Sequence, residues 1–433
     1  MKKLKRKNLL ILLVILCLVG SYIYAFNPER PMTIHLGIYS GSSWDVPNAR
    51  SYDVIDLAIK KFCQIHPNVT VTYESGVLKS DYSSWLSDKI IEGKQPDVFI
   101  VPEKDFNILS STGAMANLNR LVPQYSKIAS GFYGSCLEAG RFGDVQYALP
   151  YESNIRMMCV NTTLLKKYKI NPPKNGWSVT DFYQICKQVT RDLNNDGVPG
   201  IYGATDYTWR DAISAYGISL FNKAGTKACF NSEEVKEALS FTTKIKDLSH
   251  PYDVKANDFD EGKVAFIPMT LAQYRTYRPY PYRVAKYSTF DWNCIEMPAG
   301  DAEQATTDVE TSLFAMSPRT KHPELAWEFM QMLCCDEEVQ QYLVETSQGI
   351  SVLKKVMNSK KTEKILNKDA MNDNALTVET IDSILNKATP LPKFKKYTAA
   401  MDAADHLITE SIDNDSIELD LADIQTNVEN QLK

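Results

Sequence analysis

The chain has 433 residues and a formal net charge of −5. This length is too great for one ordinary domain, so we expect two lobes. The acidic composition argues against a nucleic-acid-binding protein, because such a surface requires clustered positive charge.

The N-terminal segment predicts export from the cytoplasm. Five basic residues lie among the first seven, and residues 9–26 carry no charge. A basic stretch before an apolar run is typical of a secretory signal, whose basic end stays in the cytoplasm. Cleavage after Ala25 would leave the bulky Ile23 at the minus-three position. Retention of residues 1–26 as a membrane anchor is the alternative, because about 18 apolar residues can just cross a bilayer. Lipidation of Cys17 is a third fate, and it is disfavoured by the bulky residue before it.

Eight of the nine cysteines lie beyond this segment. Export permits disulfides, but no Cys-x-x-Cys motif or dense framework is present. Most of the thiols are therefore predicted to be small buried hydrophobic groups, and whether any of them pair is left open. Cys334 and Cys335 are adjacent in sequence and would bridge only with strain.

The first third of the chain alternates strand and helix patterns. Apolar residues alternate over residues 34–38 and 69–73, as is typical of strands, and residues 98–101 form a continuous apolar run. Such a run indicates a parallel strand covered on both faces. Helical spacing over residues 55–62 and 85–90 separates the three strands. This order predicts a parallel α/β sheet.

Polar and aromatic residues follow the carboxyl ends of these predicted strands. Ligands of parallel α/β sheets bind beyond these ends. The ligand-binding residues predicted there are Ser43, Trp44, Glu74 and Asp105.

A further strand is predicted just before Pro150, and we expect the proline to end it. Tyr151 and Glu152 follow directly. A sugar has apolar C–H faces and a polar rim, so a carbohydrate site requires flat aromatic rings and acid or amide acceptors. Tyr151 and Glu152 are predicted to serve these two purposes.

The remaining elements are predicted in the same way. Residues 157–160 and 264–267 indicate buried strands, and Ser178 with Asp181 forms a capping-box pattern that opens a helix. Pro323 starts another helix. The last forty residues are predicted to be helical, with one apolar face made of Leu421, Ile424, Val428 and Leu432.

Four more ligand-binding candidates lie near predicted strand ends or loops. They are Trp209, Tyr274, Trp292 and Glu310. The alternative for each aromatic residue is packing in the core. For each carboxylate the alternative is a helix cap or a surface ion pair.

A short acidic stretch resembles the opening of a calcium loop. Asp192, Asn194 and Asp196 have the required spacing, but Gly203 stands where the bidentate glutamate belongs. An Asn/Asp/Gly turn is the alternative. No zinc-binding histidine spacing, P-loop or nucleophile-elbow motif is present.

The order of several motifs resembles the family 1 extracellular solute-binding proteins, the carbohydrate-binding components of ABC importers. The resemblance covers nearly all of residues 32–357. It rests on residues 96–99, 113–118, 147–150, 160–165, 177–182, 196–203, 259–266 and 321–327.

This resemblance implies a type 2 periplasmic-binding-protein-like fold, in which two α/β lobes are joined by a hinge of several segments. By analogy we expect crossings near Leu149, Ile295 and Asp336, which would place Tyr151 and Glu152 where the lobes meet. The expected lobes comprise residues 32–148 with about 298–335, and residues 149–297 with about 336–433.

The resemblance also implies a carbohydrate ligand, an ABC permease partner and a monomer without a cofactor or catalytic residue, held outside the cytoplasm by anchoring or simply secreted. An extracellular glycoside hydrolase is one alternative, since it shares aromatic and acidic residues but requires two carboxyl groups about 5–10 Å apart. A surface carbohydrate sensor is the other alternative.

Overall fold

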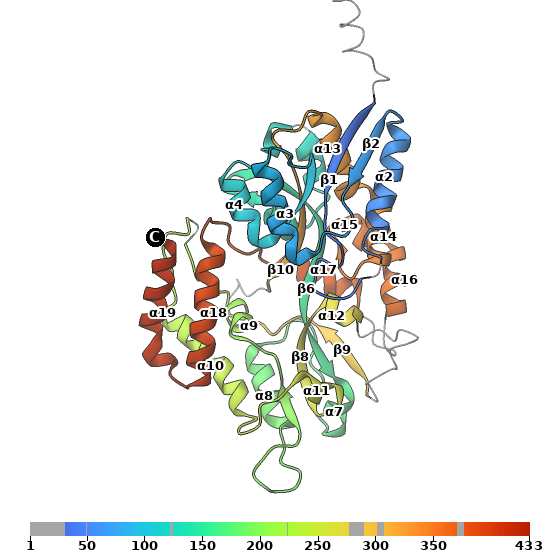
Figure 1. Cartoon of the computed structure of the whole chain (residues 1–433). Coiled ribbons are helices and arrows are strands. Elements are labelled where there is room, and N and C mark those ends of the chain that lie inside the picture. The colour runs from blue at the N-terminus through green and yellow to red at the C-terminus, as the bar shows by residue number, and fades with distance from the viewer. Residues whose placement is uncertain are drawn as a thin grey trace, which may run out of the picture.

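The computed structural model describes residues 31–48, 50–121, 124–222, 224–276, 290–300, 307–369 and 376–433. Figure 1 shows an elongated α/β molecule in which one long strand, β6 (Ala148–Asn161), runs through an upper and a lower body. The predicted export segment lies outside the described residues. Among the helices that are described, none combines the length and the apolar character needed to span a bilayer.

One large sheet runs through both bodies. Its order is β2-β1-β3-β10-β6-β8-β7, and β9 and β11 pair with β6 outside this path. Strands β1, β2 and β3 are parallel, as predicted, whereas β10 runs antiparallel to both β3 and β6. The strands other than β6 are β1 (Met32–Gly37), β2 (Val69–Tyr73), β3 (Val98–Val101), β7 (Tyr202–Ala204), β8 (Val264–Thr270), β9 (Trp292–Ile295), β10 (Val309–Met316) and β11 (Ile350–Ser351).

Strand β6 does not end at Pro150, contrary to the sequence-based expectation. The register of β10 along β6 shifts there: Ser312 pairs with Glu152, and Leu313 pairs with Pro150. Tyr151 is therefore the extra residue of a β-bulge. A proline lacks the N–H that a regular ladder needs, but it is tolerated at a bulge, so the strand continues past it.

The first hydrophobic core, defined as the buried cluster around Ile34, Phe99 and Phe314, packs the helices of the upper body onto the sheet. These helices are α2 (Asp53–Ile65), α3 (Lys79–Ile91), α4 (Phe106–Ser111), α6 (Gly134–Ala139), α13 (Pro323–Cys335), α14 (Glu337–Thr346), α15 (Lys354–Met357), α16 (Lys360–Asp369) and α17 (Val378–Lys387). This body also contains α5 (Gln124–Ala129) and the hairpin of β4 (Arg141–Phe142) and β5 (Val145–Gln146).

The second hydrophobic core, the buried cluster around Phe182, Phe266 and Leu239, lies in the lower body. It is built by α7 (Thr162–Lys167), α8 (Val179–Val189), α9 (Trp209–Ala215), α10 (Glu233–Asp247), α18 (Tyr397–Asp413) and α19 (Ile417–Leu432). Helices α11 (Ala256–Asp260) and α12 (Leu271–Thr276) place their buried side chains in the first core instead.

The two cores meet across the lower part of the sheet. Met157 and Cys159 belong to the first core, whereas Met158 and Val160 belong to the second. Successive side chains of a strand point to opposite faces, so β6 contributes to both cores at once.

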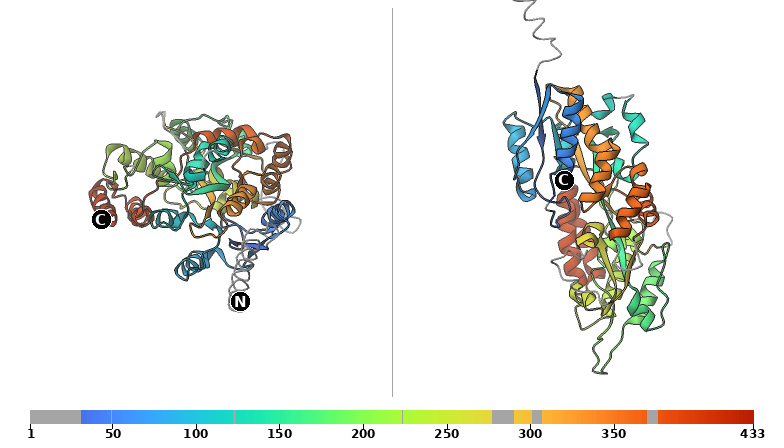
Figure 2. Two further views of the ribbon diagram at one scale, coloured as in Figure 1. Left: turned by 90° about the horizontal axis from the view of Figure 1, so that it is seen from above. Right: turned by 90° about the vertical axis from the view of Figure 1, so that its right-hand side faces the viewer.

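The packing of the C-terminal third favours a lobe division other than the expected one. Asp336 caps α14, and α13 to α17 on both sides of it pack in the first core. In Figure 2, right, the orange helices α13 and α14 lie along the blue α2. The chain passes to the second core between Leu385 and Phe394. An apolar face in the sequence shows that one side of a helix is buried, but it does not show which part of the protein packs against that side. We therefore propose this lobe boundary in place of the one near Asp336.

The helix signals read from the sequence are confirmed. Ser178 accepts a hydrogen bond from the Asp181 amide, and the Asp181 carboxylate accepts one from the Ser178 amide. The C-terminal residues form α18 and α19, with Leu421, Ile424 and Val428 buried, and both helices lie beside α10 in Figure 1.

Candidate functional site

A small pocket opens at the carboxyl end of β1, where five segments meet. Its lining comes from the loop after β1, the start of α2, β3, the β6 bulge and the end of α14. The cavity measures about 40 Å³, which is room for a few water molecules. It marks the point at which polar side chains converge.

Hydrogen bonds fix the loop that follows β1. Ser42 Oγ accepts from the Trp44 amide at 3.1 Å, and Tyr39 donates its hydroxyl proton to Ser43 Oγ at 2.9 Å. The Lys79 ammonium, at the start of α3, donates to the Ser43 carbonyl at 2.6 Å and to Asp45 at 2.7 Å. Because both sides of the loop are held, Ser43 lies at a defined position on the pocket wall.

The β6 bulge brings Tyr151 and Glu152 to the same pocket. Neighbouring residues of a regular strand point to opposite faces, but a bulge re-aims one of them. Both residues line the cavity. The Tyr151 ring packs edge-on against Phe314 at 5.0 Å between centroids, and only 6% of its surface is exposed.

Glu152 is a buried carboxylate held by the turn after α14. It accepts hydrogen bonds from the Gly349 amide at 2.9 Å and from the Ser347 hydroxyl. Burial raises the pKa of Glu152, although these hydrogen bonds and the nearby Arg275 charge oppose the rise. The indole Nε1 of Trp44 is buried beside this carboxylate, and its N–H also opposes the rise in the pKa of Glu152.

Arg275 supports this arrangement from α12 and was not found by sequence reasoning. Its guanidinium donates to the carbonyls of Ser347 at 2.9 Å and Gly349 at 2.6 Å. Burial lowers the pKa of Arg275 to about 10, and the Glu152 charge opposes that change. The arginine thus holds the turn whose amide and hydroxyl hold Glu152.

A second polar group lies on the part of β6 that faces α9. Arg156 binds both carboxylate oxygens of Asp211, through Nε at 2.5 Å and Nη2 at 3.0 Å. Asp211 also accepts from the Thr208 amide and hydroxyl at the start of α9. Nearby, burial raises the pKa of Asp308 to about 6, a hydrogen bond with Ser214 opposes the rise, and the Asp211 charge adds to it.

Glu310 and Trp209 border this second group. Glu310 is exposed on β10 and accepts a hydrogen bond from the Asn154 side chain at 2.9 Å. Trp209 is only 4% exposed and donates its indole N–H to Asp405 of α18 at 2.9 Å. The Arg210 guanidinium lies 5.1 Å from the Trp209 ring centroid. In this conformation the ring packs beneath α18 and offers no open face.

Of the predicted site residues, Ser43, Tyr151 and Glu152 line the pocket. Besides Trp44, Trp209 and Glu310, four further predicted residues do not line it. Tyr274 and Trp292 pack edge-on at 5.5 Å in the first core. Glu74 is exposed and accepts hydrogen bonds from Trp85 at 2.8 Å and Lys89 at 2.7 Å. Asp105 immediately precedes α4.

The acidic stretch before β7 forms a self-bonded turn. Asp192 accepts from the amides of Asn194, Asn195 and Gly197, and Asp196 accepts from the side chain of Asn194. The described residues contain no cluster of three histidine, cysteine or acidic side chains arranged to hold a metal ion. The carboxylate oxygens thus accept hydrogen bonds from within the turn, which is the arrangement expected of an Asn/Asp/Gly turn.

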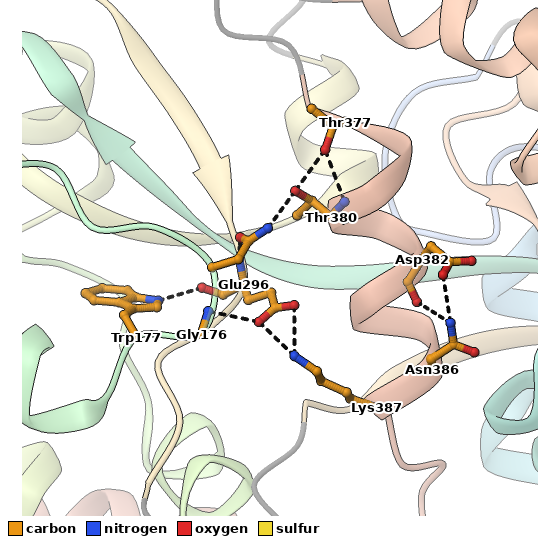
Figure 3. Close-up of polar contacts among 9 residues, drawn as sticks. Gly176, Trp177, Glu296, Thr377, Thr380, Asp382, Asn386 and Lys387 are labelled. Carbon is orange, nitrogen blue, oxygen red and sulfur yellow. Dashed lines mark hydrogen bonds and ion pairs between the residues drawn. The ribbon is translucent and has the colours of Figure 1, made fainter.

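A polar junction joins α17 to the lower body, as Figure 3 shows. Glu296 pairs with Lys387 at 3.1 Å and accepts from the Gly176 amide at 3.2 Å. The Glu296 carbonyl accepts the indole N–H of Trp177 at 2.9 Å, and Asn175 donates to Thr380 at 2.9 Å. Glu296 directly follows β9, so the junction lies where the chain leaves that strand for β10.

Comparisons with known proteins agree with this architecture. The profile of the bacterial extracellular solute-binding proteins matches residues 58–372. The chain therefore belongs to this family, whose members are binding proteins and act outside the cytoplasm. No curated protein sequence matches the chain.

Solved structures with the same two-lobe, maltose-binding-like fold cover almost the whole chain. One is an ABC substrate-binding protein from Listeria monocytogenes, with 18% identity, a TM-score of 0.68 and coverage of 93% of this chain and 99% of that one. A second, from Arthrobacter globiformis, binds cyclic maltosyl-maltose (14%, TM-score 0.76, coverage 93% and 99%). A third is the sugar-binding protein MalE of Xanthomonas citri (12%, TM-score 0.75, coverage 92% and 97%). At these identities the similarity shows the fold.

Proposed function

We propose that this protein captures an oligosaccharide between its two lobes, outside the cytoplasm, and delivers it to the membrane subunits of an ABC permease. The observation that carries the proposal is the β6 bulge, which places an aromatic ring and a carboxylate together where the long strand passes between the bodies. Support comes from two proteins of similar fold. One was solved in complex with cycloalternan, and the other was solved bound to maltotriose.

The upper part of the proposed site combines flat rings with hydrogen-bonding groups. Tyr151 and Trp44 supply aromatic surface for the C–H faces of a sugar ring. Glu152 is the acceptor for hydroxyl groups, and Ser43 adds a hydroxyl. The indole N–H of Trp44, which lies beside the Glu152 carboxylate, is a further donor for a sugar oxygen.

The lower part of the proposed site is charged. Arg156, Asp308 and Glu310 offer donors and acceptors on adjacent stretches of β6 and β10. Trp209 joins the site when α9 and α18 separate enough to uncover its ring. Glu74 accepts a hydrogen bond from Trp85, and Tyr274 packs against Trp292, both away from the two polar groups. The proposed site therefore does not include these three residues or Asp105.

Binding would follow from closure of the lobes on the ligand. A ligand shifts a protein towards the conformation that it binds better, and rotation about connecting segments is a common form of such a change. Here the bodies are connected by β6, by the link from β9 to β10 and by the link from α17 to α18. The closed, liganded form is the one that would dock on the permease.

A thermal-unfolding screen tests this proposal. The full chain without residues 1–26 is incubated with monosaccharides, linear and cyclic gluco-oligosaccharides, and short peptides. A ligand present at about 100 times its Kd stabilises the native state by about 2.7 kcal/mol, so a bound oligosaccharide raises the Tm by several degrees. Stabilisation by peptides alone would overturn the carbohydrate assignment.

The same samples separate binding from hydrolysis. Chromatography of the recovered sugars should return each oligosaccharide intact. Turnover that is abolished by Glu152→Gln would establish a glycoside hydrolase in place of a transport protein.

The manner of attachment needs its own measurement. We propose that residues 1–26 carry the chain to the outer face of the membrane. Fractionation of cells that produce the full chain should place it outside the cytoplasm, and a chain that lacks residues 1–26 should stay inside. Detection in the membrane pellet or in the medium distinguishes an anchored protein from a secreted one.

A further inference from the structure

Two cysteines from distant parts of the sequence lie in contact within the sheet. Cys159 of β6 and Cys294 of β9 are partners in the antiparallel ladder, and their Sγ atoms are 2.9 Å apart. They are separated by 135 positions in the chain. Their juxtaposition is therefore produced by the fold and not by sequence proximity.

The backbone at this position suits a covalent bridge. Directly opposite residues of antiparallel strands have Cα atoms about 4.5–5.5 Å apart, and disulfides span about 4.4–6.8 Å between Cα atoms. Both side chains already point to the same face of the sheet, because paired residues of a ladder do so. The sulfur atoms need only a small approach and no change of register.

We propose that Cys159 and Cys294 form a disulfide when the exported chain folds in the presence of a disulfide oxidant. A thiolate of one cysteine attacks the oxidant R–S–S–R and releases R–S⁻. The second thiolate then attacks the mixed disulfide and releases the other R–S⁻. The two cysteines lose two electrons to the oxidant, and the two cysteine protons leave through water to give two R–SH. Export supplies a compartment where such bonds persist.

Burial determines when this reaction takes place. Cys159 has 0% and Cys294 has 3% of its surface exposed. A disulfide reagent has no path to sulfur atoms at these positions once the sheet is formed, so the exchange belongs to folding. Burial also raises the pKa of Cys159, and contact with Cys294 raises it further, which makes the folded dithiol still less reactive.

The bridge would fasten a short strand. Strand β9 comprises four residues, and within the described residues its ladder partner is β6. It leads directly to Glu296 and so to the connection between the bodies. A disulfide at its third residue would fix the register of β9 on β6 and thereby the start of that connection.

Refolding the chain under two redox conditions tests the proposal. The chain without residues 1–26 is unfolded with reductant and refolded with oxidised and reduced glutathione, or with reductant alone. The oxidised product should be lighter by two hydrogen atoms, and peptide mapping should join the peptides of Cys159 and Cys294. Its Tm should exceed that of the reduced form by roughly 5–10 °C, because the bridge constrains a long loop in the unfolded chain.

Variants assign the effect to this pair. The double variant Cys159→Ser/Cys294→Ser should lose both the mass change and the redox dependence of Tm, whereas Cys229→Ser, at an exposed position, should keep both. Recovery of free thiols at positions 159 and 294 in the wild-type chain after oxidative refolding would overturn the proposal. That measurement needs no variant to fold. A bridge mapped to any other pair would overturn it equally.

Discussion

At the scale of single residues, the pocket depends on the packing around one carboxylate. Glu152 contacts the turn after α14, and that turn is held in place by Arg275 of α12. Gly349 lies between Glu152 and Trp44, and a Cβ atom at position 349 would stand 2.4 Å from Glu152 Oε1 and 2.6 Å from Trp44 Nε1. Each of these groups therefore limits where the others lie.

Gly349→Ala should damage both the pocket and the fold. The added methyl group forces Glu152 or Trp44 to move, and overpacking of this kind costs about 1–3 kcal/mol. We expect a lower Tm and at least tenfold weaker binding of the oligosaccharide found in the screen. Gly134→Ala is the control, because a Cβ there meets nothing within 4 Å. Wild-type stability and affinity in Gly349→Ala would show that the contact does not position the pocket.

Asp308 should make the stability of the protein depend on pH. Its pKa is raised from 3.8 in the unfolded chain to about 6 in the folded protein. A raised carboxyl pKa means that the folded state binds the proton more tightly. The stabilisation is therefore complete below pH 3.8 and is lost as the pH rises towards about 6.

Asp308→Asn should remove this dependence. The variant should be more stable than the wild type by about 1–2 kcal/mol at pH 7 and should lose that advantage near pH 4. Denaturant titrations at several pH values measure the difference, with the exposed Asp144→Asn as the control. A constant difference between pH 4 and pH 7 would show that Asp308 does not titrate in this range.

At the scale of elements, features that depend on neighbouring residues could be predicted from the sequence, whereas contacts between distant residues could not. The Ser178 cap, the apolar run of β3 and the apolar face of α19 depend on residues close in sequence. The contact of Arg275 with Gly349 spans 74 positions, and that of Glu152 with Gly349 spans 197. No periodicity reports contacts of this kind, so Arg275 and Gly349 could be found only in three dimensions. The bulge at Tyr151 was not predicted, because a proline after an apolar run usually indicates the end of a strand.

The capping box of α8 gives a prediction at this scale. Ser178→Ala removes the side-chain acceptor for the Asp181 amide and should lower the free energy of unfolding by about 1 kcal/mol. Ser178→Asp should keep most of the stability, because aspartate is also a good N-cap residue. Urea titrations of the three proteins provide the comparison. Equal midpoints for wild type and Ser178→Ala would show that α8 is held by its apolar face alone.

At the scale of the whole molecule, the two bodies are joined by more than their covalent connections. The α17 helix packs in the first core, whereas Trp177 belongs to the second. The contacts of Glu296 with Lys387 and of Asn175 with Thr380 therefore bridge the bodies, at the place shown in Figure 3. These contacts favour the arrangement in which they form, and hinge rotation that separates α17 from residues 175–177 must break them.

Removing this junction should shift the ligand-free protein away from the arrangement described here. Lys387→Ala/Thr380→Val deletes the ion pair with Glu296 and the hydrogen bonds of the Thr380 hydroxyl with Asn175 and Thr377. Because the Lys387 side chain is 58% exposed, we expect a loss of only about 1 kcal/mol, which changes a ratio of two conformations about fivefold. Small-angle X-ray scattering of the ligand-free variant should then depart from the profile of the wild type, and saturating ligand should bring the two profiles together. The control is Lys246→Ala, whose partner Asp413 lies within the lower body, so the same loss of charge leaves the hinge untouched. If both variants scatter as the wild type does, the junction supports α17 locally and does not influence the opening of the lobes.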